Sequence, residues 1–202
     1  MQRSVMLFFV LVLFLLCSGA IYAQGLKGGL SLTKYSGNDA DLGTGIDPEY
    51  AINFTAGVFL NFEIDKQFSI RPEAYYSVKG AHYEETEDGV KAEMDFTMKY
   101  IDIPILAVFK AGKNFSLIAG PAVGFFLSGE TKTKVGDESG SEEIESDEIN
   151  SPDISLVFGA NYFIGQLHLD ARYSLGMTNI PDTNEDVSLK HSMIQILLGI
   201  SF

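Results

Sequence analysis

The chain has 202 residues, which is about the length of a single domain. It holds 27 acidic and 14 basic residues, and its formal charge of −13 argues against a partner bound through nucleic-acid phosphates. Its single cysteine excludes an intramolecular disulfide framework.

The first residues are predicted to be a secretory signal peptide, residues 1–23. Arg3 gives a short basic head, residues 5–16 are apolar, and small and polar residues follow. The apolar run is shorter than the roughly 20 residues that a membrane-spanning helix needs. Cleavage after Ala23 removes one basic residue, so the mature domain, residues 24–202, carries 13 − 27 = −14 charges. Cys17 admits a second interpretation, a lipid-modified lipoprotein cysteine, which is disfavoured because the residue before it is bulky.

The mature chain shows no helical periodicity, but alternation of apolar and polar residues recurs along it. Between Ile52 and Ile64 one row is apolar and the other is polar, with Phe59 as the exception. Because side chains alternate across a strand, each such segment has one apolar and one polar face. The pattern predicts eight strands, at residues 26–35, 50–64, 68–82, 96–109, 115–128, 153–163, 167–179 and 188–202.

The connections between these strands alternate in length. Short ones lie at residues 65–67, 110–114 and 164–166, and long ones at 36–49, 83–95, 129–152 and 180–187. In an up-and-down antiparallel barrel, alternate connections lie at the same end, and bacterial outer-membrane barrels have short periplasmic turns and long extracellular loops. Most segments also reach the ~9–11 residues with which a tilted strand crosses a membrane. We therefore predict an all-β, eight-stranded antiparallel transmembrane barrel, integral to a Gram-negative-type outer membrane.

Alternation alone does not say which face is outside, and a secreted lipocalin-like barrel would place the apolar face inside. Three features favour the membrane arrangement. The polar faces carry charges of both signs near mid-strand, Lys79 among them, where they could pair in a lumen. The last strand ends the chain with an apolar row that includes Phe202. Aromatic residues also gather near the strand ends, as in interfacial girdles: Phe54, Phe62, Phe68, Phe109, Phe115, Phe125, Tyr162 and Phe202.

Four segments in this order resemble the PorT-type outer-membrane β-barrel family of Bacteroidetes. They are RPEAYYSVKG (71–80), YIDIPIL (100–106), AGPAVGFFLSG (119–129) and DARYSLGMTNI (170–180). The terminal Phe202 resembles the C-terminal aromatic residue that barrel-assembly machinery recognises. The resemblance implies an eight-stranded outer-membrane barrel. Most members have no assigned activity, and the founding type is associated with secretion and maturation of surface proteins.

Five charged residues share the predicted inward parity: Arg71, Glu73, Asp102, Asp170 and Arg172. They could form a proton relay or an ion-selecting constriction. The favoured interpretation is a structural polar network, because an eight-stranded barrel is only wide enough for side chains to fill it. Pro104 shares this parity and lacks an N–H, so we expect a bulge or a polar lumen group near it.

The long connections at residues 83–95 and 129–152 are strongly acidic and are predicted to be mobile, solvated loops. They supply many oxygen ligands, but residues 137–148 lack the spacing of an EF-hand, so we assign no metal site. No cofactor site is predicted either. The expected contacts are outer-membrane lipid, the assembly machinery, and a protein, a glycan or divalent cations at the loops.

Catalysis is the least favoured interpretation. His168 lies beside the short turn at residues 164–166, whereas His82 and His191 lie near the long-loop end, where Ser77, Ser128 and Ser192 could be close. No spacing marks a nucleophile with an orienting base. The sequence therefore predicts a structural or binding protein that acts through acidic extracellular loops. An accessory role in protein secretion or surface-protein maturation is the alternative, and a small-solute pore is disfavoured by the filled lumen.

Overall fold

The computed structural model describes residues 24–202 except 43–44, 88–89, 137 and 182–187. The predicted signal peptide lies outside the described residues. The strands are β1 (Gly25–Ser36), β2 (Ala51–Phe59), β3 (Phe62–Glu63), β4 (Phe68–Glu87), β5 (Val90–Lys110), β6 (Phe115–Val135), β7 (Glu138–Ile144), β8 (Asp153–Ile164), β9 (Leu167–Gly176) and β10 (Lys190–Ser201).

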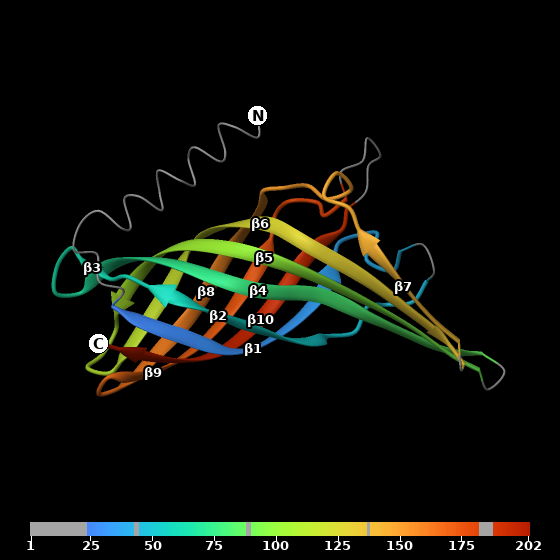
Figure 1. The fold of residues 1–202 in the computed structure, drawn as a ribbon. Coiled ribbons are helices and arrows are strands. Elements are labelled where there is room, and N and C mark those ends of the chain that lie inside the picture. The colour runs from blue at the N-terminus through green and yellow to red at the C-terminus, as the bar shows by residue number, and fades with distance from the viewer. Residues whose placement is uncertain (1–23, 43–44, 88–89, 137, 182–187) are drawn as a thin grey trace.

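The strands close into an eight-stranded antiparallel barrel, as predicted (Figure 1). β1 pairs with β2 on one side and with β10 on the other, so the two ends of the chain's sheet meet. β2 and the short β3 together act as one barrel strand beside β4. None of the described residues forms a helix that is long and apolar enough to cross a membrane.

The faces of the barrel are arranged as a membrane requires. Apolar side chains on the outside are exposed, including Leu30, Phe54, Ile105, Phe158 and Leu198, whereas the inward side chains are buried and mostly polar. This is the inverse of a soluble carrier and matches an outward apolar band in lipid. Phe59, which breaks the apolar–polar separation of its segment, points inward and is buried. It packs edge-on against His168, with ring centres 5.1 Å apart.

Two of the predicted long loops are not loops, and this part of the prediction was wrong. β4 runs on to Glu87 and β5 begins at Val90, so residues 83–87 and 90–95 are paired strands rather than a mobile connection. β6 likewise runs to Val135 and pairs with β7, which covers much of the acidic segment 129–152. The physical reason is that alternation continues past the lipid-facing part, so the strands stay paired in water.

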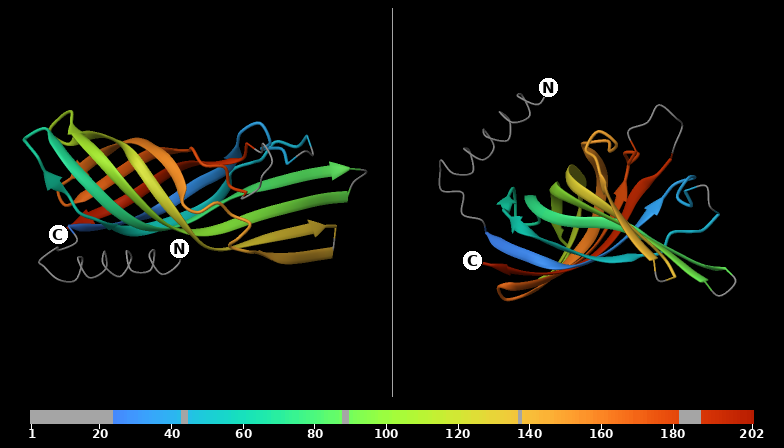
Figure 2. Two further views of the ribbon diagram at one scale, coloured as in Figure 1. Left: turned by 90° about the horizontal axis from the view of Figure 1, so that it is seen from above. Right: turned by 45° about the vertical axis from the view of Figure 1, so that its right-hand side comes forward.

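These strand ends form a four-stranded sheet that projects beyond the barrel (Figures 1 and 2). We call it the extension, and it comprises residues 81–87, 90–98, 129–135 and β7. The short turns lie at the opposite end, which is the periplasmic end in barrels of this kind. The extension is therefore assigned to the extracellular side.

Candidate functional site

The lumen near the periplasmic end holds a compact group of buried charges, which we call the lower cluster: Lys27, Arg71, Glu73, Asp170 and Arg172. Lys27 Nζ lies 2.9 Å from Glu73 Oε1 and 2.6 Å from Asp170 Oδ2. Arg172 Nη1 lies 2.6 Å from Glu73 Oε2, and Arg172 Nη2 donates to Asp170. Each carboxylate thus meets two cations, which is how buried charges are tolerated.

Arg71 belongs to the lower cluster but pairs differently. Its Nη1 donates to Asn161 Oδ1 over 2.7 Å, and its guanidinium lies over the rings of Phe59 and Phe163. The structure therefore brings Glu73, Asp170 and Arg172 into direct contact, as their parity indicated, and holds Arg71 beside them through an amide and aromatic rings.

Asp102 lies in a second group nearer the extracellular end, the upper cluster: Lys79, Asp102, Asp153 and His191. Lys79 Nζ lies 2.8 Å from Asp102 Oδ1 and 3.0 Å from Asp153 Oδ2. His191 Nδ1 lies 3.3 Å from Asp153 Oδ2. Asp102 therefore pairs with a lysine on the adjacent strand β4 and not with the arginines that share its inward parity.

Gly124 makes room for the upper cluster. A Cβ at this position would lie 2.5 Å from Asp102 Oδ1 and 3.2 Å from Lys79 Nζ. Pro104 also lines this part of the lumen, and the β4–β5 pairing is interrupted opposite it, between Pro72 and Tyr75. A bulge follows at Lys99 and Tyr100 on the other side of β5.

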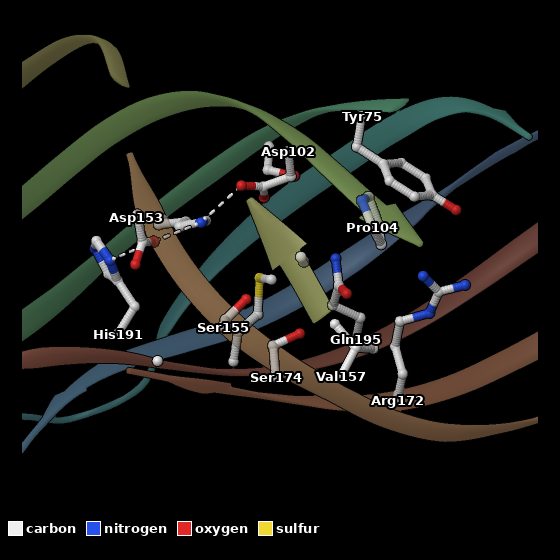
Figure 3. Close-up of a pocket in the computed structure, with 15 residues that line it drawn as sticks. Tyr75, Asp102, Pro104, Asp153, Ser155, Val157, Arg172, Ser174, His191 and Gln195 are labelled. Carbon is white, nitrogen blue, oxygen red and sulfur yellow. Dashed lines mark hydrogen bonds and ion pairs between the residues drawn. The ribbon is translucent and has the colours of Figure 1, made fainter. Parts of the chain in front are cut away.

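The space between the clusters is almost filled (Figure 3). Its open volume is about 20 Å³, and Tyr75, Arg172 and Gln195 are among the side chains around it. This volume is enough for about one water molecule. Several buried polar atoms nearby, such as the hydroxyl of Ser77, lack a protein partner. We expect an ordered water there rather than an aqueous channel.

An apolar layer closes the extracellular mouth of the barrel. Its buried members are Tyr35, Ala81, Tyr83, Met98, Tyr100, Ile149, Ile180 and Leu189. Tyr83 Oη donates to the carbonyl of Ala40, 2.5 Å away. This hydrogen bond links the extension to the first extracellular loop, which joins β1 to β2 (residues 37–50). The pKa of Tyr83 is raised to about 12, mainly because burial disfavours the phenolate.

The outer face of the extension is charged, and its charges are largely paired. Lys91 Nζ lies 2.9 Å from Glu84 Oε2 and 2.5 Å from Glu93 Oε1, and His82 Nδ1 lies 2.7 Å from Asp95 Oδ1. The hydrogen bond with Asp95 is the main cause that raises the pKa of His82 above its ordinary value. The hydrogen bond from Lys91 lowers the pKa of Glu84. His82, Glu84 and Glu93 also lie close enough to surround one metal ion, but the ammonium of Lys91 already contacts both glutamates.

The three histidines lie in different parts of the fold. His82 lies on the extension, His191 in the upper cluster and His168 near the periplasmic end. His168 Nε2 lies 3.3 Å from Ser201 Oγ, and its Nδ1 lies 4.0 Å from Asp170 Oδ1. Ser192, which the sequence placed near His82 and His191, bonds Tyr173.

Sequence reasoning missed two residues of the two clusters, Lys27 and Asp153, and it placed Lys79 on a polar face without including it in the predicted network. Lys27 and Lys79 have the inward parity of their strands, and Asp153 opens a strand next to the predicted acidic loop. The parity signal was present for both lysines. It did not identify their partners, because Lys79 meets Asp102 through the register between β4 and β5, and the other partners lie on strands distant in sequence.

No curated protein sequence matches this chain. Among solved structures, Neisserial surface protein A (NspA) aligns with a TM-score of 0.52 at 13% identity, covering 88% of this chain and 96% of that one. Ail, the attachment invasion locus protein of Yersinia pestis, aligns with a TM-score of 0.46 at 14% identity, covering 88% and 97%. At these identities the likeness to NspA concerns the fold alone, and the likeness to Ail adds nothing to it.

A family-level match covers most of the sequence. The family described as Outer membrane protein beta-barrel domain matches residues 22–182, which include all the barrel strands but β10. The closed antiparallel barrel and its outward apolar face agree with that description. The match does not distinguish a PorT-type member from others. The chain belongs to the outer-membrane β-barrel domain family and is an integral outer-membrane protein.

Proposed function

We propose that this outer-membrane barrel is a surface binding protein that acts through its extension and acidic extracellular loops. The observation that carries the proposal is the extension itself, where β4, β5 and β6 continue as paired strands well beyond the barrel (Figure 2). Paired strands hold side chains in fixed positions, which suits a recognition surface better than a mobile loop does.

The charge of this region indicates the chemistry of a partner. Residues 83–95 hold six acidic residues and one lysine, and residues 129–152 hold eight acidic residues and two lysines. A cationic protein surface or divalent cations complement this charge, and an anionic glycan does not. We therefore propose cationic partners, rather than an anionic glycan, as the ligands of this surface.

A pore is a poorer proposal for this barrel. The two charged clusters and the apolar mouth layer occupy the lumen, and the space between the clusters holds about one water. An ion passing through would have to displace ion pairs such as Lys79–Asp102, so we expect no steady conductance in planar bilayers.

Catalysis is also a poorer proposal, although Ser201, His168 and Asp170 lie in a row. Asp170 already meets Lys27 and Arg172, and its free oxygen is 4.0 Å from the histidine, beyond hydrogen-bond reach. The backbone N–H groups of Ser201 and Phe202 are engaged with other carbonyls, so they offer no oxyanion hole. We therefore propose a role without chemistry.

The alternative proposal is an accessory role in secretion or surface-protein maturation, and the resemblance to PorT-type proteins is its support. Phe202 is exposed at the periplasmic end of the barrel and is proposed as the residue that assembly machinery recognises. Co-purification with secretion components would favour this alternative over a binding role at the cell surface.

The test is a shortened chain in which a two-residue Asn-Gly turn replaces residues 130–143, which pair across the β6–β7 hairpin. Gly129 and Ile144 are direct partners, so the turn can close the hairpin there. Cells that display equal amounts of either chain are compared for capture of a cationic protein such as histone. We expect capture to fall when the hairpin is removed. Equal capture by both chains contradicts the proposed binding role.

A further inference from the structure

The two faces of the extension differ in their charges. Its lysines, Lys91, Lys132 and Lys134, all lie on the outer face, where they pair with carboxylates or face them across the strands. Tyr83, Ala92, Met94 and Val135 form an apolar stripe on the inner face, where Tyr83 pairs with Met94 and Ala92 with Val135. The charged residues of this face in the described chain are carboxylates, including Glu85, Glu138 and Glu142.

An apolar groove lies between this inner face and the first extracellular loop. Leu42 and Ile46 of the loop form one wall, and Tyr83, Met94 and Val135 of the extension contribute to the other. Its volume is about 240 Å³, which is several times the volume of a water molecule and suits one large apolar side chain. Glu85 also borders it from the inner face. Glu84 and Glu93 belong to its lining as well, but their carboxylates contact Lys91 on the outer face.

The groove is held open by anchored walls. Tyr83 donates to Ala40 in the loop, and the side chain of Asp39 accepts from the backbone N–H of Ser188 over 2.7 Å. Leu42 is kept exposed with φ at +53°, a region that a bulky side chain rarely adopts. A preformed groove costs little ordering on binding, which favours a ligand that inserts one side chain.

The negative charge around the groove favours some ligands over others. A second copy of this chain would bring another strongly acidic extension to an acidic border, and anionic lipid or glycan would be repelled in the same way. Among the described residues Glu85 makes no ion pair, so the border retains an unneutralised carboxylate beside the apolar floor. An apolar side chain flanked by lysine or arginine complements both features.

Resting on the proposed binding function, we infer that this groove binds a cationic peptide segment of another protein by inserting one large apolar side chain. The apolar side chain fills the space between Leu42 and Met94, and a flanking cation meets Glu85. The inference names both the place and the chemical class of the partner.

The full barrel in detergent micelles is titrated with three capped peptides: Lys-Lys-Phe-Lys-Lys, its Ser-centred analogue, and Glu-Glu-Phe-Glu-Glu. We expect the first to bind, the second to bind about tenfold more weakly because it buries no aromatic ring, and the third to show no binding. Ala92→Trp fills the groove and should reduce binding of the first peptide to the level of the second. Thr133→Trp, on β6, fills the same groove and serves as a second variant if Ala92→Trp does not fold.

A matched pair of charge variants tests the border. Glu85→Gln, on the inner face, should weaken binding of the Phe-centred peptide several-fold, whereas Glu130→Gln, on the outer face beside Lys132, should leave it unchanged. The groove inference is overturned if the Phe-centred and Ser-centred peptides bind equally and neither tryptophan variant weakens their binding. That result would still agree with a diffuse acidic binding surface. Absence of any cationic peptide binding overturns both. If no peptide binds, but the barrel dimerises or binds lipid and Ala92→Trp abolishes that interaction, the groove has another occupant. This result also overturns the inference.

Discussion

The same strands carry opposite patterns in the barrel and in the extension. On β5, Ile105 faces outward in the barrel and Asp102 inward, whereas in the extension Glu93 faces outward and Met94 inward. The pleat continues without a break in its alternation, and only the sign of the alternation is inverted. The inversion marks the place where the surroundings of the outer face change from lipid to water.

The barrel lumen and the extension also differ in how their charged side chains are paired. In the lumen, carboxylates and cations meet at hydrogen-bond distance in two clusters, because an unpaired charge there is costly. In the extension, the inner face keeps acidic side chains such as Glu85 without a cation among the described residues. We infer that the lumen charges mainly stabilise the fold and that the extension is available for binding.

The largest expected effect comes from Arg172→Met in the lower cluster. The change leaves Glu73 and Asp170 with fewer cations in a buried site, which should lower the free energy of unfolding by roughly 3–5 kcal/mol. Urea unfolding of the micelle-bound barrel, followed by gel mobility, measures it. Lys132→Met on the extension is the matched control, and equal stability of both variants contradicts a stabilising lower cluster.

Lys79→Met should be the next most damaging change. It removes the cation between Asp102 and Asp153, and the expected loss is about 1–3 kcal/mol because a water can enter the small adjacent space. Adding Asp102→Asn and Asp153→Asn should recover part of the loss. A triple variant less stable than the single one would show that the lysine is not the partner that these carboxylates need.

Shortening the β4–β5 hairpin should affect the barrel little. Replacing residues 84–93 by Asn-Gly joins the direct partners Tyr83 and Met94 by a two-residue turn. We expect the free energy of unfolding to change by less than about 1 kcal/mol, since the removed residues lie outside the lumen and its mouth layer. A loss as large as that from Lys79→Met would mean that the extension supports the barrel.

The smallest expected effect is a pH dependence within the extension. The pKa of His82 is raised, chiefly by its hydrogen bond with Asp95, so this interaction is complete below the ordinary histidine pKa near 6.5 and is lost as pH rises through the raised value. Amide hydrogen exchange, corrected for its intrinsic pH dependence, should become slightly faster around His82 over that window. His82→Gln should abolish the change, and an opposite trend with pH would contradict the pairing.

Most of the barrel could be predicted from the sequence because alternation reports local parity. The rows through Ile105 and Asp102 identified the lipid and lumen faces, and the position of each short turn followed. The extension was missed although Val90 to Tyr100 alternates throughout, because the acidic content of residues 83–95 was given more weight than their alternation. A high net charge favours disorder only in a segment that is not held in place by pairing with a neighbouring strand.

The pairs within the candidate sites were less predictable than the faces. Parity placed Asp102 inward, but its partner Lys79 depends on the register between β4 and β5. The groove depends on the first extracellular loop folding back onto Tyr83, a contact between residues far apart in sequence. Such contacts are set by closure of the barrel, which no single segment encodes.

Cysteine labelling on intact cells tests most directly that one strand faces lipid and then water. The single native cysteine lies in the predicted signal peptide, so Glu93→Cys and Ile105→Cys, both outward on β5, can be compared in an otherwise cysteine-free mature chain. A membrane-impermeant maleimide should label Glu93→Cys and leave Ile105→Cys unlabelled until the membrane is dissolved and the protein unfolded. Protection of Glu93→Cys, or labelling of Ile105→Cys on intact cells, would contradict the inversion at the membrane boundary.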